Sequence, residues 1–269
     1  MIGVRSSVSL AVMATAAATV ALGGGAAHGA VHGTGHPSAA TTVNPVDTES
    51  GLPSAQDLAG GQQAKAMRRT PKWSLPRDFS LHTHKRIFFL TIDDGYGRTG
   101  GALQYVRQHK IPVTVFLTNA AIQGHASYYR KITRFGGSVQ NHTMTHKSFT
   151  SSSVNLKREI CQTQRNYRRV FGSAPTLLRP PYGNGGYLDT PTSVWKRISQ
   201  TAAGCGVQHV VMWDAVVANG KNEFVRGKLR RGDIMLAHFG PRLETDLRAV
   251  MAAARHAGLK PAILTDFLK

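Results

Sequence analysis

The feature of this sequence that most restricts its fold is the alternation, beyond Lys85, of short apolar runs with longer stretches of helical periodicity. The apolar runs are rich in Ile, Val and Phe, as buried β-strands are. Strands that alternate with helices form parallel sheets, because each helix carries the chain back to the edge where the next strand starts. The sequence therefore predicts an α/β fold.

Seven short strands are expected after Lys85. The expected strands are 86–92, 112–117, 138–141, 176–179, 208–213, 234–237 and 261–264. The expected helices are 101–108, 154–170, 192–203 and 242–256. Seven strands indicate an irregular seven-stranded (β/α) barrel, and barrel enzymes place their catalytic residues at the C-terminal ends of the strands.

The N-terminal part of the chain has a different composition. Arg5 precedes an uncharged apolar run and then small residues up to Ala27, which is the pattern of a secretory signal peptide over residues 1–27. The apolar run is short for a membrane span, which needs about 20 residues. We therefore expect a secreted protein with no stable membrane span after processing, although an uncleaved anchor is the alternative. Residues 28–84, rich in Gly, Ala, Ser, Thr and Pro, are expected to be a flexible spacer before a catalytic domain at 85–269.

The chain is strongly basic, with a formal net charge of +19. A protein of this charge attracts polyanions. Because the chain is expected outside the cell and has no nucleic-acid-binding motif, the expected partners are anionic polymers of the cell envelope, not nucleic acid. Cys161 and Cys205 lie at the expected helices that flank strand 176–179, so we expect a disulfide between them.

Two segments suggest a metal site. Asp93 and Asp94 directly follow the first expected strand, where a barrel enzyme has its active site. Alone, this pair could equally cap the next helix. His142 and His146 are four residues apart, and on one helical turn both imidazoles would face one ion. Two imidazoles and a carboxylate leave coordination positions open for water and substrate, as a hydrolytic ion requires.

Two later segments place further polar groups at strand ends. In RPPYG, which begins at Arg179, the prolines stiffen the backbone and could direct the Tyr182 N–H towards a developing oxyanion, although a rigid turn is the simpler interpretation. In LAH, His238 follows strand 234–237, where it could protonate a leaving group, although a lone histidine at such a position is usually structural.

Together, the segments TIDDG, HTMTH, RPPYG and LAH resemble, in this order, the NodB-type polysaccharide deacetylases, or carbohydrate esterase family four. The resemblance extends from Arg86 to the C-terminus. It implies a barrel of the NodB type and a metal-dependent hydrolase that removes N-acetyl groups from a cell-wall or chitin-like polysaccharide, with peptidoglycan N-acetylglucosamine favoured. The alternatives are an esterase for O-acetylated, xylan-type glycans and a non-catalytic wall-binding protein.

The resemblance also implies the metal ligands and the general base. Asp94, His142 and His146 correspond to the ligands of one divalent ion. Zinc is the expected ion, although Co²⁺, Ni²⁺ and Mn²⁺ would also suit these ligands. Asp93 corresponds to the base that deprotonates water, and Arg179 corresponds to the residue that orients this base.

Five further residues receive roles from the resemblance. Tyr182 corresponds to the backbone donor to the oxyanion, and His238 corresponds to the acid that protonates the departing amine. Pro181, Gly183 and Trp213 are expected to contact the substrate.

The chain departs from the family after the fifth expected strand. The family has an Asp-Trp pair where this chain has Asn219 and Gly220. In the family that Asp partners the acid histidine and that Trp walls the acyl pocket. An amide cannot stabilise a protonated imidazole as a carboxylate does, so we expect His238 to lose its proton at lower pH than in the family, unless Asp214 replaces the missing partner. The pocket should also be wider.

Overall fold

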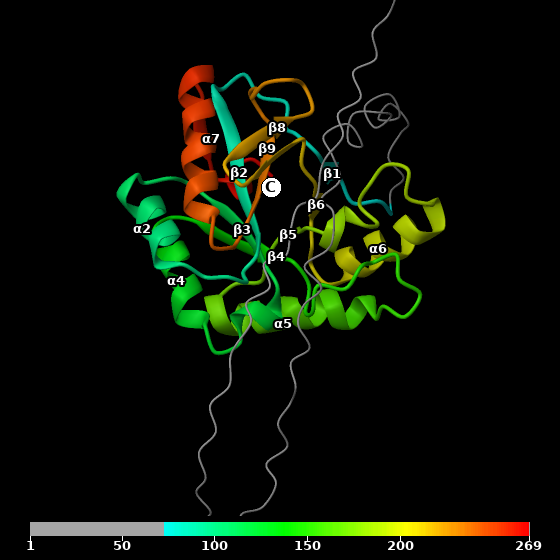
Figure 1. Ribbon diagram of the computed structural model, residues 1–269. Helices are drawn as coiled ribbons and strands as arrows, with labels where there is room; N and C mark the ends of the chain where they lie inside the picture. Colours follow the sequence, from blue (N-terminus) through cyan, green and yellow to red (C-terminus); the bar gives the residue numbers. More distant parts are fainter. Residues whose placement is uncertain (1–72, 269) are drawn as a thin grey trace, which may run out of the picture. The chain divides into compact units, whose positions relative to one another are not determined.

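The computed structural model describes residues 73–268, in which ten strands form one curved sheet surrounded by helices (Figure 1). The strands are β1 (Arg77–Asp78), β2 (Ile87–Asp94), β3 (Thr114–Leu117), β4 (Ser138–Asn141), β5 (Leu177–Leu178), β6 (His209–Val211), β7 (Ala215–Ala218), β8 (Lys221–Phe224), β9 (Ile234–His238) and β10 (Lys260–Ala262). Their order across the sheet is β1-β6-β5-β4-β3-β2-β9-β7-β8, and β10 also pairs with β2.

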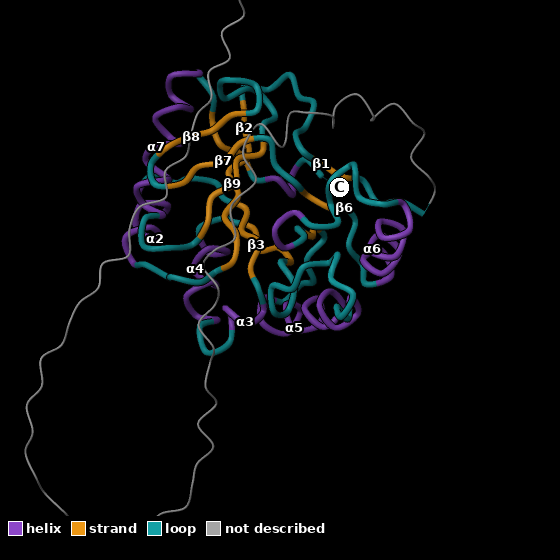
Figure 2. Tube along the Cα trace, turned by 45° about the vertical axis from the view of Figure 1, so that its right-hand side comes forward, coloured by secondary structure: helices purple, strands orange, loops and turns teal. Residues whose placement is uncertain are grey.

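Helices cover the outside of this sheet (Figure 2). They are α2 (Gly100–Gln108), α3 (Asn119–Ile122), α4 (Ala126–Arg134), α5 (Thr163–Phe171), α6 (Thr192–Gly204) and α7 (Leu243–Ala257), with the π-helix η1 (Lys157–Gln162) directly before α5 and the short 3₁₀ turns η2 (Pro181–Gly183) and η3 (Leu264–Asp266). None of the helices described here is both long and apolar enough to cross a membrane.

Strand β2 is central, and it is buried on both faces. Phe88, Leu90 and Ile92 point towards α2 and α7, whereas Phe89 packs on the opposite side of the sheet, with the exposed fraction of these four side chains at 2% or less. Alternate side chains of a strand point to opposite faces, so a strand covered on both sides needs the continuous apolar run that this sequence provides.

The register of the sheet brings the C-terminal ends of several strands together. Strand β2 is parallel to both β3 and β9, and Asp93 lies opposite Phe116 on one side and His238 on the other. Strand β4 ends at Asn141, opposite Leu178 of β5. The residues that follow β2, β4, β5 and β9 therefore lie at the same edge of the sheet, as the fold class predicts.

The α/β class is confirmed, but the count of seven strands is not. The seven expected strands correspond to β2, β3, β4, β5, β6, β9 and β10, and the described residues add β1, β7 and β8. Strands β7 and β8 form an antiparallel hairpin in which Ala218 pairs with Lys221. Asn219 and Gly220 connect them with φ values of 54° and 76°, which are the conformations that a two-residue type I′ turn requires.

The folded part of the chain also starts before Lys85. Strand β1 pairs with β6, and Trp73 and Leu75 pack against the apolar cluster beneath α6. The backbone N–H of Leu75 donates to the Ser199 hydroxyl at 2.6 Å. The last part of the expected spacer is thus structured, because its few apolar residues complete the core. The expected signal peptide and the rest of the spacer lie outside the described residues.

A disulfide joins the helices on either side of β5, as expected. Cys161 of η1 is bonded to Cys205, which directly follows α6. The two residues are 44 positions apart, and closing a loop of this length typically stabilises a fold by about 2–4 kcal/mol.

Candidate active site

Asp93 is held in place by a buried arginine at the end of β2. The exposed fraction of Asp93 is 2% and that of Arg179 is 0%. Nη1 of Arg179 donates to Oδ1 of Asp93 at 2.7 Å and to the Thr91 hydroxyl at 2.8 Å. The other guanidinium nitrogens donate to the carbonyl oxygens of Val211 and Met212. A guanidinium fixed on all sides leaves Asp93 one orientation, with Oδ2 turned towards the histidines.

Asp94, His142 and His146 form a compact cluster beside Asp93. Oδ1 of Asp94 lies 3.2 Å from Nε2 of His142 and 3.1 Å from Nε2 of His146. The two Nε2 atoms are 3.1 Å apart. Nδ1 of His142 lies 2.8 Å from the carbonyl oxygen of Arg179, so this carbonyl fixes the ring and leaves Nε2 directed at the cluster.

The geometry of this cluster fits one metal ion. One atom from each of the three side chains lies within 4.8 Å of the others. Oδ1 of Asp94 is buried without a hydrogen bond of good geometry, although both imidazoles lie close to it. A buried carboxylate oxygen that faces two nitrogen donors is suited to share a cation with them.

The expected helical turn across His142 and His146 is wrong. These residues lie in a loop after β4, with φ values of 75° at Thr143 and 62° at His146. Side chains hold the loop: Oδ1 of Asn141 accepts the Thr143 N–H at 2.7 Å, and the buried Glu159 accepts the Thr145 N–H at 2.9 Å. Side-chain acceptors that bind the backbone locally compete with helix formation.

The charges of the cluster balance each other. Burial disfavours a charged His142, but the nearby Asp93 and Asp94 carboxylates outweigh it and raise the pKa of His142. Burial also disfavours a charged Asp94, yet the two imidazoles hold the pKa of Asp94 well below its ordinary value. The carboxylates and imidazoles of the cluster thus stabilise each other's charged forms, and a divalent ion would have to compete with protons for the imidazoles.

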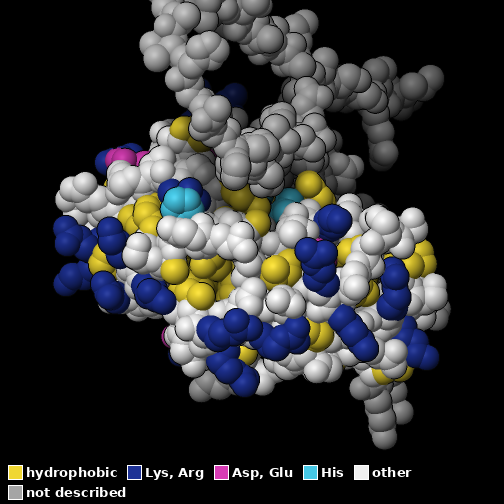
Figure 3. Space-filling view, turned by 90° about the horizontal axis from the view of Figure 1, so that it is seen from below, with side chains coloured by type: hydrophobic (Ala, Val, Ile, Leu, Met, Phe, Trp, Pro, Cys, Tyr) yellow, Lys and Arg dark blue, Asp and Glu magenta, His cyan; other side chains and the backbone are white. Residues whose placement is uncertain are grey.

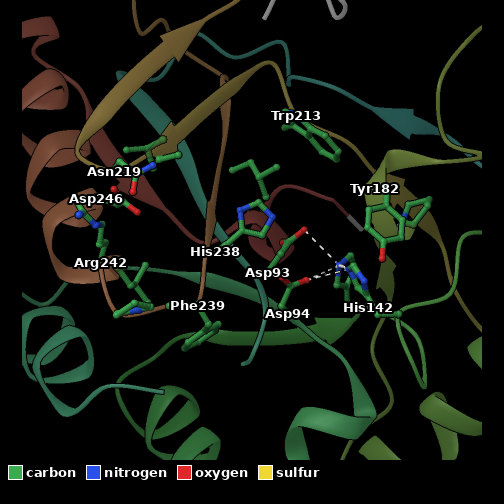
Figure 4. Close-up of a pocket in the computed structure, with 18 of the residues that line it drawn as sticks. Asp93, Asp94, His142, Tyr182, Trp213, Asn219, His238, Phe239, Arg242 and Asp246 are labelled. Atoms are coloured by element: carbon green, nitrogen blue, oxygen red, sulfur yellow. Dashed lines mark hydrogen bonds and ion pairs between the residues drawn. The ribbon is translucent and has the colours of Figure 1, made fainter. Parts of the chain in front are cut away.

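These residues line one cavity of about 720 Å³, shown in Figure 4. His238, half-buried at the end of β9, lies in its centre, beside Asp93. Tyr182 lies at the opposite side from Asn219 and has a φ of 59°. The exposed fraction of Tyr182 is 39%, and its ring packs edge-on against the ring of His146, with centroids 4.6 Å apart.

The residues expected to contact substrate divide into two groups. Trp213 lines the cavity, and its ring also lies against the Arg179 guanidinium. Pro181 and Gly183 are buried in the turn and are not among the cavity residues, whereas Pro180 is. The ring of Tyr187 lies close beside Gly183. A Cβ added at Gly183 would lie only 2.6 Å from the Tyr187 side chain.

The cavity also contains a carboxylate that the sequence motifs do not reveal. Asp246 of α7 is 6% exposed, lines the cavity and accepts the Gly220 N–H at 2.6 Å through Oδ1. In Figure 4 it lies beside Asn219 and Arg242, on the far side of His238 from Tyr182. A signal was present, since Asp246 falls on the buried face of α7, between the buried Leu243 and Val250. An acidic residue on such a face needs a partner.

Asp214 does not replace the missing partner of His238. Its Oδ1 accepts the N–H of Ile234, the first residue of β9. His238 is four residues further along this strand, which is about 13 Å at the usual rise per residue. Oδ2 of Asp214 instead accepts a hydrogen bond from Nη2 of Arg226 at 3.1 Å, and Arg226 also binds Asp233.

Comparison with known proteins places the chain in a family. The family model for polysaccharide deacetylases matches residues 80–203. An uncharacterized protein of Streptomyces coelicolor is 33% identical over 196 residues, which cover 70% of this chain and 74% of that protein. The chain belongs to the polysaccharide deacetylase family. The family match contains Asp93, Asp94 and the RPPYG segment, whereas His238 lies beyond it.

Two relatives of this family member carry descriptive names. The peptidoglycan-N-acetylmuramic acid deacetylase PdaC of Bacillus subtilis is 30% identical over 113 residues, which cover 41% of this chain and 24% of PdaC. A peptidoglycan-N-acetylglucosamine deacetylase of Bacillus cereus is 27% identical over 168 residues, which cover 61% of this chain and 59% of that enzyme. The chain thus spans less than two thirds of either relative.

Solved structures share the fold of this polysaccharide deacetylase family member. A family 4 carbohydrate esterase from Bacillus anthracis has a TM-score of 0.56 and 24% identity, covering 70% of this chain and 84% of that chain. A pseudoenzyme of the same family from Bacillus anthracis has a TM-score of 0.58 and 20% identity, covering 71% of this chain and 68% of that chain. Because a pseudoenzyme shares the fold, any argument for turnover must rest on the residues of the cavity.

Proposed function

We propose that this chain is a metal-dependent hydrolase that removes N-acetyl groups from a cell-wall or chitin-like polysaccharide, with N-acetylglucosamine of peptidoglycan as the favoured substrate. The names of the relatives from Bacillus support this class of substrate. The observation that carries the proposal is that one cavity contains the three-residue cluster, a fixed carboxylate and a half-buried histidine. The expected leader segment agrees with action outside the cell.

Asp94, His142 and His146 would hold the ion, and zinc suits two imidazoles and one carboxylate. When bound there, a divalent ion polarises the acyl carbonyl and makes water more acidic. Asp93 would accept the proton of the attacking water. Its Oδ1 is engaged by Arg179, whereas its Oδ2 lies 3.8 Å from Nε2 of His142, beside the cluster. Arg179 keeps Asp93 oriented for this step.

The remaining two steps belong to Tyr182 and His238. An amide nitrogen cannot leave as an anion near neutral pH, so it must be protonated as the bond breaks. His238 lies in the same cavity as Asp93, on the neighbouring strand, and can donate this proton. We assign the backbone N–H of Tyr182 to the developing oxyanion, since the turn after β5 places this residue at the cavity beside His146.

Acetate release from N-acetylglucosamine oligomers tests the proposed function. We expect the chain to release acetate, to stop when a chelator removes the ion, and to resume when zinc is added. Release that continues unchanged after complete removal of metal would contradict the metal-dependent mechanism.

The proposed ligands can be tested without turnover. We expect about one equivalent of divalent metal per chain, and loss of this metal when His142 and His146 are both replaced by alanine. His256→Ala, which changes an exposed histidine of α7, is the matched control and should keep the metal. Elemental analysis of the purified proteins decides the question, and a double variant that holds as much metal as the parent would show that the site lies elsewhere.

A further inference from the structure

The seam between η1–α5 and α6 contains two hollows that share no residue with the catalytic cavity. The first, of about 360 Å³, is lined by Lys157 of η1 and Arg197 of α6. The second, of about 440 Å³, is lined by Arg165, Arg168 and Arg169 of α5 and by the end of α6. The disulfide lies between the two helices at the second hollow, so this part of the seam is covalently closed.

The positive charge of this seam is not neutralised within the described residues. From residue 126 to residue 204 the sequence contains two acidic residues, Glu159 and Asp189. Glu159 is 3% exposed, and its carboxylate accepts hydrogen bonds from the N–H and the hydroxyl of Thr145. Thr145 lies in the loop between His142 and His146, which we call the histidine loop. In the part of the chain that the structure describes, no Arg or Lys of α4, η1, α5 or α6 forms a salt bridge with a carboxylate. The arginines that do are Arg179, Arg226 and Arg248.

Favourable interactions with helix dipoles explain only part of this accumulation of Lys and Arg side chains. Arg168 and Arg169 lie in the last turn of α5, where cations interact favourably with the helix dipole. Lys157 lies at the start of η1 and Arg197 in the middle of α6, where the dipole gives no such benefit. Figure 3, viewed from the α5 side, shows Lys and Arg side chains spread across this face with few acidic side chains among them.

We propose that the seam binds an extended phosphodiester polymer of the cell envelope, of the poly(glycerol phosphate) type. Four of the five cations in the hollows are arginines, and the guanidinium group binds phosphate oxygens in a bidentate manner. Lys157 and Arg165 are eight residues apart along one helical element, so the two hollows lie roughly 12 Å apart. A chain with regularly spaced phosphates can therefore occupy both at once.

The spacing of the hollows favours a polymer over a single anion. One phosphate could occupy one hollow only, whereas a chain gains from both because the second contact is intramolecular. Binding at the seam would leave the catalytic cavity open, since the two share no residues. The chain would thus be held at the wall while the cavity acts on a neighbouring glycan, a consequence that rests on the proposed function.

The experiment measures binding of fluorescent poly(glycerol phosphate) to the purified chain at several salt concentrations. The test variant carries Arg165→Gln, Arg168→Gln and Arg169→Gln. The control variant carries Arg107→Gln, Lys228→Gln and Arg255→Gln, three exposed cations outside the seam, and so loses the same charge. We expect the test variant to bind at least about tenfold more weakly and with a shallower salt dependence, and the control to stay within about threefold of the parent.

Several outcomes would overturn this proposal. Equal losses in both variants would show that net charge alone attracts the polymer, and no loss in the test variant would exclude the seam. Tighter, seam-dependent binding of single-stranded DNA, of a polycarboxylate or of anionic lipid vesicles would assign the seam to that ligand. Acetate release from short N-acetylglucosamine oligomers should be the same in all three proteins, so a failure of the proposed catalysis appears in the parent and is distinguishable from a failure at the seam.

Discussion

Four non-glycine residues that line the catalytic cavity have left-handed backbone conformations, with φ of 75° at Asp94, 62° at His146, 59° at Tyr182 and 54° at Asn219. Such conformations cost roughly 1 kcal/mol or more each for residues with a Cβ, and they concentrate at functional sites. Each of the four redirects the chain just after or near a strand end. The strained positions thus include two of the three proposed ligands, the proposed oxyanion donor and the hairpin tip that lines the same cavity as His238.

Substitution of Asn219 tests whether His238 acts as the general acid. Asn219→Asp restores a carboxylate in the cavity of His238, and an Asp-Gly pair forms the same type of turn, so the hairpin should be kept. A carboxylate stabilises a protonated imidazole. We therefore expect the alkaline limb of the pH profile of kcat/KM to move to higher pH. The profile from pH 5 to 9 is the measurement. No movement in Asn219→Asp, together with movement in Asp246→Asn, would assign the partner role to Asp246 instead.

The protonation of Asp214 should make the free energy of unfolding depend on pH. Burial, and then the neighbouring Asp233, raise the pKa of Asp214 to about 8. An unfolded aspartate ionises near pH 4. Between these values the folded state holds a proton that the unfolded state has lost, so the contribution is complete below about pH 4 and disappears as the pH rises towards 8. For one proton, the slope is up to about 1.4 kcal/mol per pH unit.

Replacing the Asp214 carboxyl should make the free energy of unfolding less dependent on pH. Asp214→Asn keeps an acceptor for the Ile234 N–H but cannot ionise. We expect the free energy of unfolding of this variant to fall less between pH 5 and 8 than that of the parent. Denaturant unfolding at several pH values measures it, with the exposed Asp266→Asn as control. A parent and variant with parallel curves would mean that Asp214 ionises in the folded state as it does in the unfolded chain.

The β7–β8 hairpin contains the two positions at which the chain departs from the family motif. Asn-Gly is a strong sequence signal for a type I′ hairpin turn, but comparison with the family pattern draws attention only to the missing Asp and Trp. Gly220 has a φ of 76°, and a Cβ at this position would lie 3.1 Å from Thr245 Cγ2. The turn therefore requires glycine, and a tryptophan could not simply be restored here.

The hairpin can be tested with a pair of glycine substitutions. Gly220→Ala forces a side chain into a left-handed conformation and should lower the free energy of unfolding by roughly 1–2 kcal/mol. Gly204→Ala, at the end of α6, has an ordinary φ and nothing within 4 Å of the added Cβ, so it should be neutral or stabilising. Denaturant unfolding of both proteins gives the comparison, and equal effects would contradict the assigned turn.

Some elements of this fold can be predicted from the sequence, whereas others depend on contacts between residues that are far apart along the chain. Long apolar runs such as that of β2 are predictable, because burial on both faces demands them. Strand β1 has two residues, too few for any periodicity, and its pairing depends on the distant β6. The histidine loop looks helical by spacing alone, since its actual shape depends on a hydrogen bond from the Thr145 N–H to Glu159, 14 residues away. Asp246 was missed because its partner Gly220 is 26 residues away.

In the part of the chain that the structure describes, a large group of Lys and Arg side chains lies away from the catalytic cavity. The carboxylates of the cavity are Asp93, Asp94 and Asp246, and one cation, Arg242, lines it as well. The Arg and Lys side chains of α4, η1, α5 and α6 lie outside the cavity and form no salt bridge within the described residues. A polyanion is therefore drawn to the helices and repelled from the carboxylates of the cavity. A substrate that is weakly charged at the acyl group suits this arrangement, which agrees with an N-acetylated sugar.

We propose above that the amide bond of an N-acetyl group is hydrolysed in this cavity with Asp93 as the base. The most direct measurement compares acetate release by the parent and by Asp93→Asn, each loaded with zinc and each assayed for bound metal. We expect equal metal in both proteins, release by the parent, and a rate at least about a hundredfold lower in the variant, because the amide cannot accept the proton. A zinc-loaded parent that releases no acetate, or a variant as fast as the parent, would contradict it.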